Sequence, residues 1–215
     1  MPRRFSDPFW RHRSNIRDVP RPQLHQTDTM LDATRDLLLE SGTRAATIEA
    51  IAAASGAPIG TIYHRFGSRE SLLTRLWMRA VYRSQASFVV AMEHPDPQEA
   101  AVAAALSLFD FCEQHPADAR LLASFGREDL IGITPDGPLA EELAELNRPV
   151  ERAVVALAKR LYGTRSRRAL DRTLLVVFDL PYGASRRLLI EGRPLPRALR
   201  SDLETAVRRV IGEPL

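Results

Sequence analysis

The chain has 215 residues, of which 45% are hydrophobic and 27% are charged, and its formal net charge is +3. This composition is close to that of an average soluble protein, which excludes a fully disordered chain, and the length allows an ordinary domain plus a small second one. The sequence lacks the run of roughly 20 apolar residues that a membrane span needs, and its N-terminal arginines do not precede an apolar segment as in a secretory signal. A single cysteine, Cys112, cannot form an internal disulfide. We therefore predict a cytoplasmic protein with no membrane partner.

The first 25 residues are a basic arm that is rich in proline and that we expect to be flexible. Six arginines accompany two aspartates here, which gives the arm a net charge of +4, whereas residues 26–75 carry −1. Arginine-rich extensions next to a DNA-binding unit can follow phosphates or enter the minor groove. Arg3 and Arg4 are therefore candidate DNA contacts; the alternative is a solvated tail without a role.

Helical periodicity predicts three short helices after the arm. The first covers about residues 27–41. Thr47 precedes an apolar i, i+3, i+4 set, which is typical of the N-cap of a second helix. The third helix covers about residues 58–65, and proline is tolerated in its first turn because that position needs no N–H. The second and third helices, joined by Ser55-Gly56-Ala57, form a helix-turn-helix pattern.

The third of these helices has an unusual outward face. If its apolar side consists of Ala57, Ile62 and Phe66, the outward residues are Pro58, Ile59, Gly60, Thr61, Tyr63 and His64. A solvated helix normally exposes Lys, Glu or Arg instead. In a DNA groove, a glycine lets the backbone approach closely, threonine and histidine can bind base edges or phosphates, and isoleucine can contact a thymine methyl group. The pattern therefore favours a DNA-docking face over an ordinary surface.

The rest of the chain also shows helical periodicity, and no convincing alternating strand is present. Further helices are expected at about residues 68–92, 98–114, 117–130, 138–162, 166–190 and 196–211, with a kink or break at Pro181. Within the apolar run 174–180, Asp179 is expected to be buried and paired with Arg186. The last two helices carry apolar rows, which favour a dimer interface over internal core; these rows are Leu170, Leu174, Val177, Leu199, Leu203 and Val207, with Gly183 and Ala184 for close approach.

Residues 27–75 resemble the DNA-binding domain of the TetR family of transcriptional regulators. The Gly60-Thr61-x-Tyr63-x-x-Phe66 core, the alanine-rich helix before it and the cap Ser68-Arg69-Glu70 occur together, and the residues that carry the resemblance are Thr47-Ile48, Ile51-Ala52, the run from Ser55 to Glu70, and Leu72-Leu73. In two places the chain departs from the family pattern. Pro58 replaces the usual Ser or Thr, and Arg65 stands where the family often has His.

The resemblance implies roles for individual residues. Thr47 and Tyr63 would contact phosphates, Arg69 (often lysine in the family) would contact the DNA backbone, and residues 58–61 with His64 would read or flank bases. With the arm included, the predicted DNA contacts are Thr47, Pro58, Ile59, Gly60, Thr61, Tyr63, His64, Arg69, Arg3 and Arg4. The resemblance also implies a ligand cavity in the C-terminal helices, for which the candidate lining residues are Trp77, Phe88, Phe109, Cys112, Phe125, Phe178 and Tyr182.

We therefore predict an all-α protein in which an N-terminal three-helix helix-turn-helix domain is joined by a long helix to a C-terminal helical ligand-binding and dimerisation bundle. The expected divisions are the arm at 1–25, the DNA-binding domain at 26–72 and the effector domain at 73–215. The predicted function is a ligand-responsive regulator, a repressor that binds a palindromic operator in double-stranded DNA as a homodimer. Its effector would be a hydrophobic or amphipathic small molecule.

Two other function classes were weighed against this one. The first is a helical ligand-binding or scaffolding protein that no longer reads DNA. The second is a small helical enzyme, but the sequence has no Gly-Lys-Ser/Thr phosphate loop, no metal-ligand spacing and no nucleophile motif. We therefore expect no catalytic residue, no metal and no cofactor.

Overall fold

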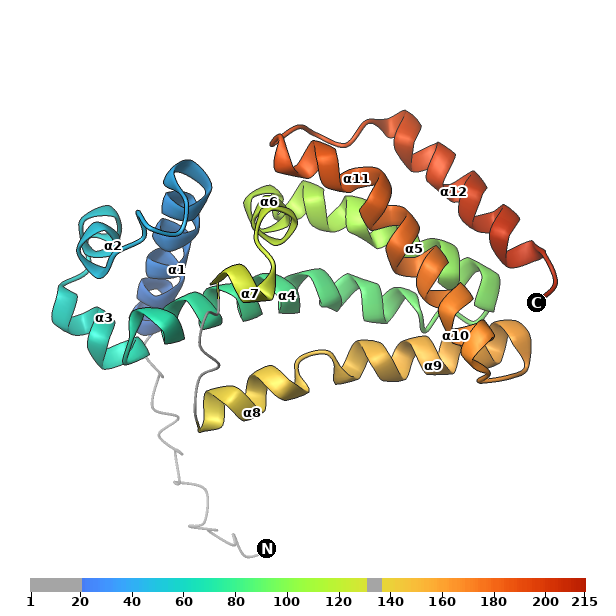
Figure 1. The fold of residues 1–215 in the computed structure, drawn as a ribbon, viewed down its shortest axis with the longest axis horizontal. Helices are drawn as coiled ribbons and strands as arrows, with labels where there is room; N and C mark the ends of the chain where they lie inside the picture. The colour runs from blue at the N-terminus through green and yellow to red at the C-terminus, as the bar shows by residue number, and fades with distance from the viewer. Residues whose placement is uncertain (1–20, 131–136) are drawn as a thin grey trace, which may run out of the picture.

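The structure, a computed structural model, describes residues 21–130 and 137–215, with side chains from residue 26 onward. All regular structure in these ranges is helical, which confirms the predicted all-α class (Figure 1). None of the helices described is long and apolar enough to cross a membrane. A long helix, α4 (Arg69–Ala91), runs along the middle of the molecule, with α1–α3 at one end and the C-terminal helices around the rest of its length.

The helix-turn-helix consists of α1 (Arg21–Ser41), α2 (Ile48–Ser55) and α3 (Ile59–Phe66), so the first helix begins earlier than expected. Local signals set the ends of the shorter helices. The Thr47 hydroxyl accepts a hydrogen bond from the Ala50 N–H, and Gly56 ends α2 in the left-handed region at φ 69°. Gly67, at φ 76°, ends α3, and Ser68 then caps α4. These are the ends that the sequence predicts to within a residue or two.

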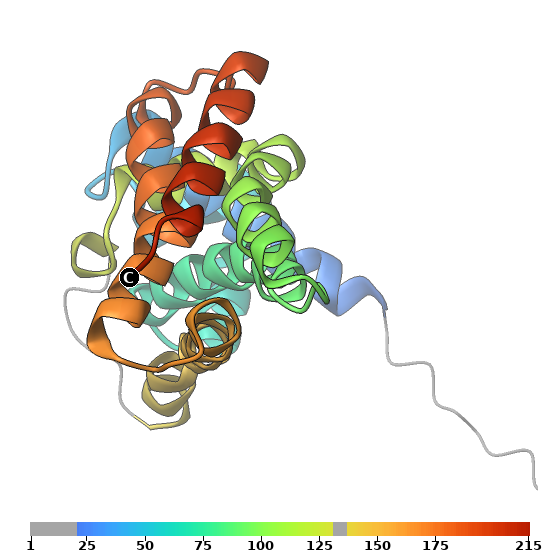
Figure 2. The same cartoon turned by 90° about the vertical axis from the view of Figure 1, so that its right-hand side faces the viewer.

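The C-terminal part is a bundle of helices packed on α4 and on one another. Its elements are α5 (Pro97–Gln114), α6 (Pro116–Ser124), α7 (Arg127–Leu130), α8 (Pro138–Glu145), α9 (Arg148–Tyr162), α10 (Arg167–Leu174), the π-helical turn η1 (Leu175–Asp179), α11 (Leu180–Ile190) and α12 (Arg197–Gly212). Figure 2 views the bundle from the end that carries the C-terminus, where α12 lies between the α10–α11 run and α5.

Two of the helices predicted after α4 are broken. The segment predicted as one helix over 117–130 forms α6 and α7, because the backbone at Phe125 is extended. The segment predicted over 138–162 forms α8 and α9, and the proline in the first turn of α9 favours a new helix start there.

The predicted irregularity at Pro181 takes the form of the π-helical turn η1, in which the Leu180 N–H bonds to the Leu175 carbonyl five residues earlier. Pro181 itself is buried in the first turn of α11. The prediction for Asp179 is wrong: its side chain is exposed, and Arg186 donates to the Tyr182 hydroxyl instead. The reason is that the apolar run has two sides, since Val176 and Val177 are buried whereas Leu174, Leu175 and Phe178 are exposed.

The helix-turn-helix and the effector domain share a hydrophobic core. Buried residues of α1–α3, such as Leu38, Ile51 and Ile62, belong to one continuous cluster with Leu72 and Leu76 of α4. The same cluster continues to Leu121 of α6, Leu130 of α7, and Leu143 and Leu146 at α8. A second cluster fills the bundle between α5, α9, η1 and α12.

Candidate DNA-binding surface and ligand cavity

The outward face of α3 is apolar and aromatic. Ile62 and Phe66 are 0% and 8% exposed and anchor the helix in the core, whereas Ile59 and Tyr63 are 43% and 49% exposed. The other outward residues are the exposed Pro58, Gly60 and His64 and the half-buried Thr61. The structure thus brings together on one surface the six residues that the sequence predicts for it. Ile59 and Tyr63 are four residues apart and are therefore neighbours on this helix surface.

The start of α3 has no side-chain cap. Pro58 stands at the N-cap position and makes no capping hydrogen bond. The Thr61 N–H bonds to the Pro58 carbonyl, which leaves the N–H groups of Ile59 and Gly60 at the helix start without a capping side chain. Such groups attract anions. The proline that replaces a polar residue of the family pattern thus leaves this helix start open towards a phosphate.

Arg69 holds the loop that precedes α2. Its Nε donates to the Ala46 carbonyl at 2.7 Å, and its Nη2 donates to the Thr43 carbonyl. The guanidinium is half-buried and fixes the backbone directly before Thr47, whose exposed hydroxyl caps α2. The sequence pattern assigned Arg69 a direct DNA contact and did not indicate this bracing of the loop.

Arg65 is directed away from the DNA-docking face. It is half-buried, and its Nη1 donates to the Thr27 hydroxyl of α1, so it ties the recognition helix to the first helix. Arg65 is therefore engaged in a contact within the domain, whereas a side chain that reads DNA must be exposed. The two remaining predicted contacts, Arg3 and Arg4, lie outside the described residues.

A cavity of about 570 Å³ lies between α4, α5, α6, α9 and α11. Five of the seven residues that the sequence proposes for a ligand cavity line it: Trp77, Phe88, Phe125, Phe178 and Tyr182. The Phe178 and Tyr182 rings stack with their centroids 5.9 Å apart. The size and the apolar lining are those of a site for a drug-sized organic molecule.

Phe109 and Cys112 do not line the cavity. On α5 the cavity side is formed by Ala104, Ser107, Leu108 and Phe111, at helical spacing, and Phe109 lies on another side of the same helix. Phe109 is 3% exposed in the bundle core, with the Arg200 guanidinium 5.6 Å from its ring centre. Burial raises the pKa of the Cys112 thiol to about 12, so it is an inert, half-buried packing residue.

Polar groups of the cavity gather between α4 and α9. The Gln85 amide donates to the Asn147 side-chain oxygen at 3.0 Å, and Glu151 and Arg127 are exposed at the same wall. The deeper lining is aliphatic and aromatic, with the hydroxyls of Ser84 and Ser107 as its polar groups. In the described ranges, no three His, Cys, Asp or Glu side chains gather as the ligands of a metal would.

A helix-turn-helix with an exposed recognition face, packed without a break onto a helical bundle that contains a cavity, defines the class of one-component DNA-binding regulators. Residues 30–76 match the family model described as "Bacterial regulatory proteins, tetR family". No curated protein matches the sequence. Residues 30–76 are thus similar to the DNA-binding domain of TetR-family transcriptional regulators, as their sequence pattern indicates.

Solved structures share the fold over most of the chain. The TetR-family regulator PfmR from Thermus thermophilus is 20% identical, with a TM-score of 0.62 over 86% of this chain and 98% of PfmR. The fatty acid degradation regulator FadR from Bacillus halodurans is 18% identical, with a TM-score of 0.62 over 87% and 98%. The multidrug binding protein EbrR is 20% identical, with a TM-score of 0.53 over 88% and 97%.

Proposed function

We propose that the protein is a homodimeric repressor that binds a palindromic operator and releases it when an apolar or amphipathic small molecule enters the cavity. The observation that carries the DNA-binding part is the outward face of α3, where Ile59 and Tyr63 are close to half exposed and charged side chains are absent among the six outward residues. Pro58, Ile59, Gly60, Thr61 and His64 read or flank bases, and Tyr63 and Thr47 bind phosphates.

The second copy of the chain covers the outer face of η1 and α11. The apolar rows that the sequence offered for this interface are partly buried and partly exposed in the structure. Val177, Leu203 and Val207 are 2%, 5% and 0% exposed and belong to the internal core. Leu174, Leu175 and Phe178 remain exposed at 40%, 39% and 54%, next to the exposed Gly183 and Ala184. Leu174 and Phe178 also line the cavity, so the proposed interface borders the ligand site. An apolar strip flanked by two small residues favours close helix–helix approach in a twofold dimer. Such a dimer would place two α3 helices about one DNA turn, ~34–36 Å, or a multiple of it apart.

The effector is an organic molecule with an apolar body. Its body contacts the aromatic lining of the cavity, and its polar group lies near Gln85 and Asn147, where the cavity is polar. The names of two structural neighbours, a fatty acid degradation regulator and a multidrug binding protein, are in keeping with such ligands. Release of DNA requires that the ligand bind the DNA-incompetent conformation more tightly, and a coupling free energy of roughly 1–3 kcal/mol would be ordinary.

DNA binding is tested with the purified protein, on DNA from its own upstream region and on a random library selected for binding, at two salt concentrations with nonspecific competitor. We expect protection of one palindromic site. Tyr63→Phe removes the hydroxyl that contacts phosphate, and we expect it to weaken operator binding by about tenfold, since one charge-assisted hydrogen bond is typically worth roughly 1.5 kcal/mol or more.

Tyr82→Phe is the matched control, because Tyr82 is 45% exposed on α4 and belongs to neither the α3 face nor the cavity lining. Equal operator affinity of Tyr63→Phe and Tyr82→Phe would remove Tyr63 from the DNA contacts. If selection yields no preferred site, the protein is a ligand-binding protein that no longer reads DNA.

A further inference from the structure

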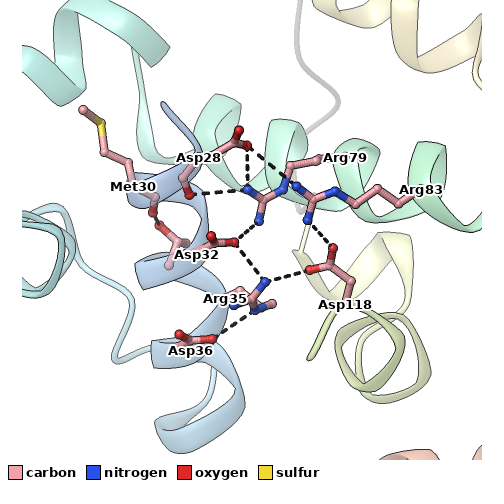
Figure 3. Close-up of polar contacts among 9 residues, drawn as sticks. Asp28, Met30, Asp32, Arg35, Asp36, Arg79, Arg83 and Asp118 are labelled. Atoms are coloured by element: carbon pink, nitrogen blue, oxygen red, sulfur yellow. Dashed lines mark hydrogen bonds and ion pairs between the residues drawn. The ribbon is translucent and has the colours of Figure 1, made fainter. Parts of the chain in front are cut away.

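Seven charged side chains form a cluster where the DNA-binding and effector domains meet, and they come from three helices (Figure 3). At its centre is Asp118 of α6, which is 1% exposed. One oxygen of its carboxylate accepts a hydrogen bond from Arg35 of α1 at 3.0 Å, and the other accepts one from Arg83 of α4 at 2.7 Å. The remaining members are Asp28, Asp32 and Asp36 of α1 and Arg79 of α4.

The cluster is continuous from α1 to α4. Arg35 also pairs with Asp32 at 2.9 Å and with Asp36 at 3.0 Å on its own helix. Arg79 pairs with Asp28 at 2.9 Å and with Asp32 at 2.7 Å, so α1 and α4 are joined directly as well. Arg35 and Arg79 are 15% and 12% exposed, but their partners Asp28, Asp32 and Asp36 are 52%, 44% and 55% exposed. The contacts to the 1% exposed Asp118 are therefore the ones best shielded from water and salt.

A buried ion pair contributes little to net stability, because the cost of removing charges from water offsets much of their attraction. The rest of the contact between α1 and α6 is apolar, through the core that contains Leu38 and Leu121. Apolar packing tolerates small sliding movements. The hydrogen bonds of Asp118, at 2.7 and 3.0 Å and with fixed directions, tolerate such movements less readily.

Asp118 lies between the cavity and the helix-turn-helix. The residue after it, Ala119, lines the cavity, as do Leu122 and Ala123 one turn further along α6. On the other side, Arg35 belongs to the helix whose buried face packs against Ile51 of α2 and Ile62 of α3. A displacement of α6 therefore acts on α1, and through α1 on the recognition helix.

We propose that Asp118 is a positioning residue for DNA binding: its ion pairs with Arg35 and Arg83 hold the helix-turn-helix at one angle to the C-terminal bundle. The link to DNA binding rests on the proposed function. The positioning part concerns the chain alone and can be tested without an operator or an effector.

The test is a distance between two spin labels, one in each domain, measured by pulsed electron paramagnetic resonance. The labels are placed at the exposed positions of Ala54→Cys on α2 and Arg152→Cys on α9, in a Cys112→Ala background. Tag-selected heterodimers in which a single chain carries the labels keep the distance intramolecular, and a monomer is measured directly. The full-length chain is used throughout.

Arg35→Gln is the informative variant, because it removes the link between α1 and α6 while Asp118 keeps its Arg83 partner. We expect a distance distribution at least half again as broad as that of the wild type, with unchanged helical content by circular dichroism. Arg35→Lys keeps a cation at this position and should restore much of the narrow distribution. Glu142→Gln breaks the exposed ion pair to Arg75 outside the cluster and should leave the distribution unchanged.

A distribution in Arg35→Gln that matches the wild type would overturn the proposal. If Arg35→Gln does not fold, the double variant Arg35→Met with Asp118→Leu, which replaces the charges by apolar side chains, is measured instead with the same two outcomes. Where an operator is known, Arg35→Gln should bind it about tenfold more weakly with the same base preference. A failure to find any operator would count against the proposed function. The distance measurement would still decide whether Asp118 positions the helix-turn-helix.

Discussion

Asp118 shows how much a single residue's charge state depends on its neighbours. Its burial by itself would raise the pKa of the carboxyl group, but hydrogen bonds from Arg83 and Arg35 outweigh burial and bring the pKa below its ordinary value. The carboxylate is therefore charged throughout the neutral and mildly acidic range. Burial would lower the pKa of Arg35, but its hydrogen bonds to Asp118 and Asp36 outweigh burial and raise it.

The pH dependence of stability follows from this shift. A carboxyl group whose folded pKa is depressed stabilises the fold above its unfolded pKa, near 3.9, and loses that contribution as the pH falls through the lower folded pKa. Asp118→Asn should lower the free energy of unfolding by about 3 kcal/mol at neutral pH, because it leaves two arginines without a buried anion. Urea unfolding should show this difference unchanged from pH 7 to pH 5 and shrinking below about pH 4. A difference that closes above pH 6 would contradict the assignment.

The sequence did not indicate this cluster, although it predicted which residues of α3 face outward. Asp118 follows a proline at the start of a helix, where an acidic residue is ordinary. Its partners lie 83 and 35 residues away in the chain, so its burial depends on how three helices meet. The face of α3 could be predicted because helical spacing alone separates Ile62 and Phe66 from the outward residues.

At the level of helices, local signals defined the N-terminal domain well and the C-terminal domain less well. Thr47, Gly56 and Gly67 set helix ends through short-range hydrogen bonds and backbone conformation, and these effects are visible in sequence. The phase of α5, which separates Phe111 in the cavity from Phe109 in the core, depends on which neighbours pack on it. The π-helical turn η1 likewise changes which of its residues face outward, and apolar periodicity does not reveal it.

The turn η1 carries the proposed dimer contact, and one substitution tests it. Leu175 is 39% exposed and does not line the cavity, so Leu175→Glu places a charge on the outer face without disturbing the ligand site. We expect at least a tenfold weaker dimer by analytical ultracentrifugation, because an apolar contact is replaced by a charge that must lose water. Val90→Glu on α4 is the control, since Val90 is 68% exposed and lies outside this strip. Equal dissociation constants for the two variants would place the interface elsewhere.

At the level of the whole molecule, the charge of the arm tests how the chain approaches DNA. Residues 26–75 carry a net charge of −1, so the arm would supply much of the attraction to phosphates. Replacing Arg3 and Arg4 by Ala should make the log–log dependence of operator affinity on salt less steep, by up to about 0.9 for each phosphate that an arginine no longer neutralises. Arg167→Ala with Arg168→Ala, which changes charge by the same amount on exposed positions of α10, is the control. A slope equal to that of the control variant would show that these two arginines do not touch DNA.

The core that runs without interruption from α1 to α8 has a consequence for protein engineering. Consider a chimera in which residues 26–72, the predicted DNA-binding domain, are moved onto another protein. A cut at the end of this domain would remove Leu76, Leu121 and Leu143 from the hydrophobic core that they share with α1–α3. The DNA-binding domain would therefore have to be transferred together with α4, α6 and α8, or joined to a protein whose side chains fill the same space. The DNA-binding domain and the C-terminal bundle can be exchanged only together with the core residues through which they pack on each other.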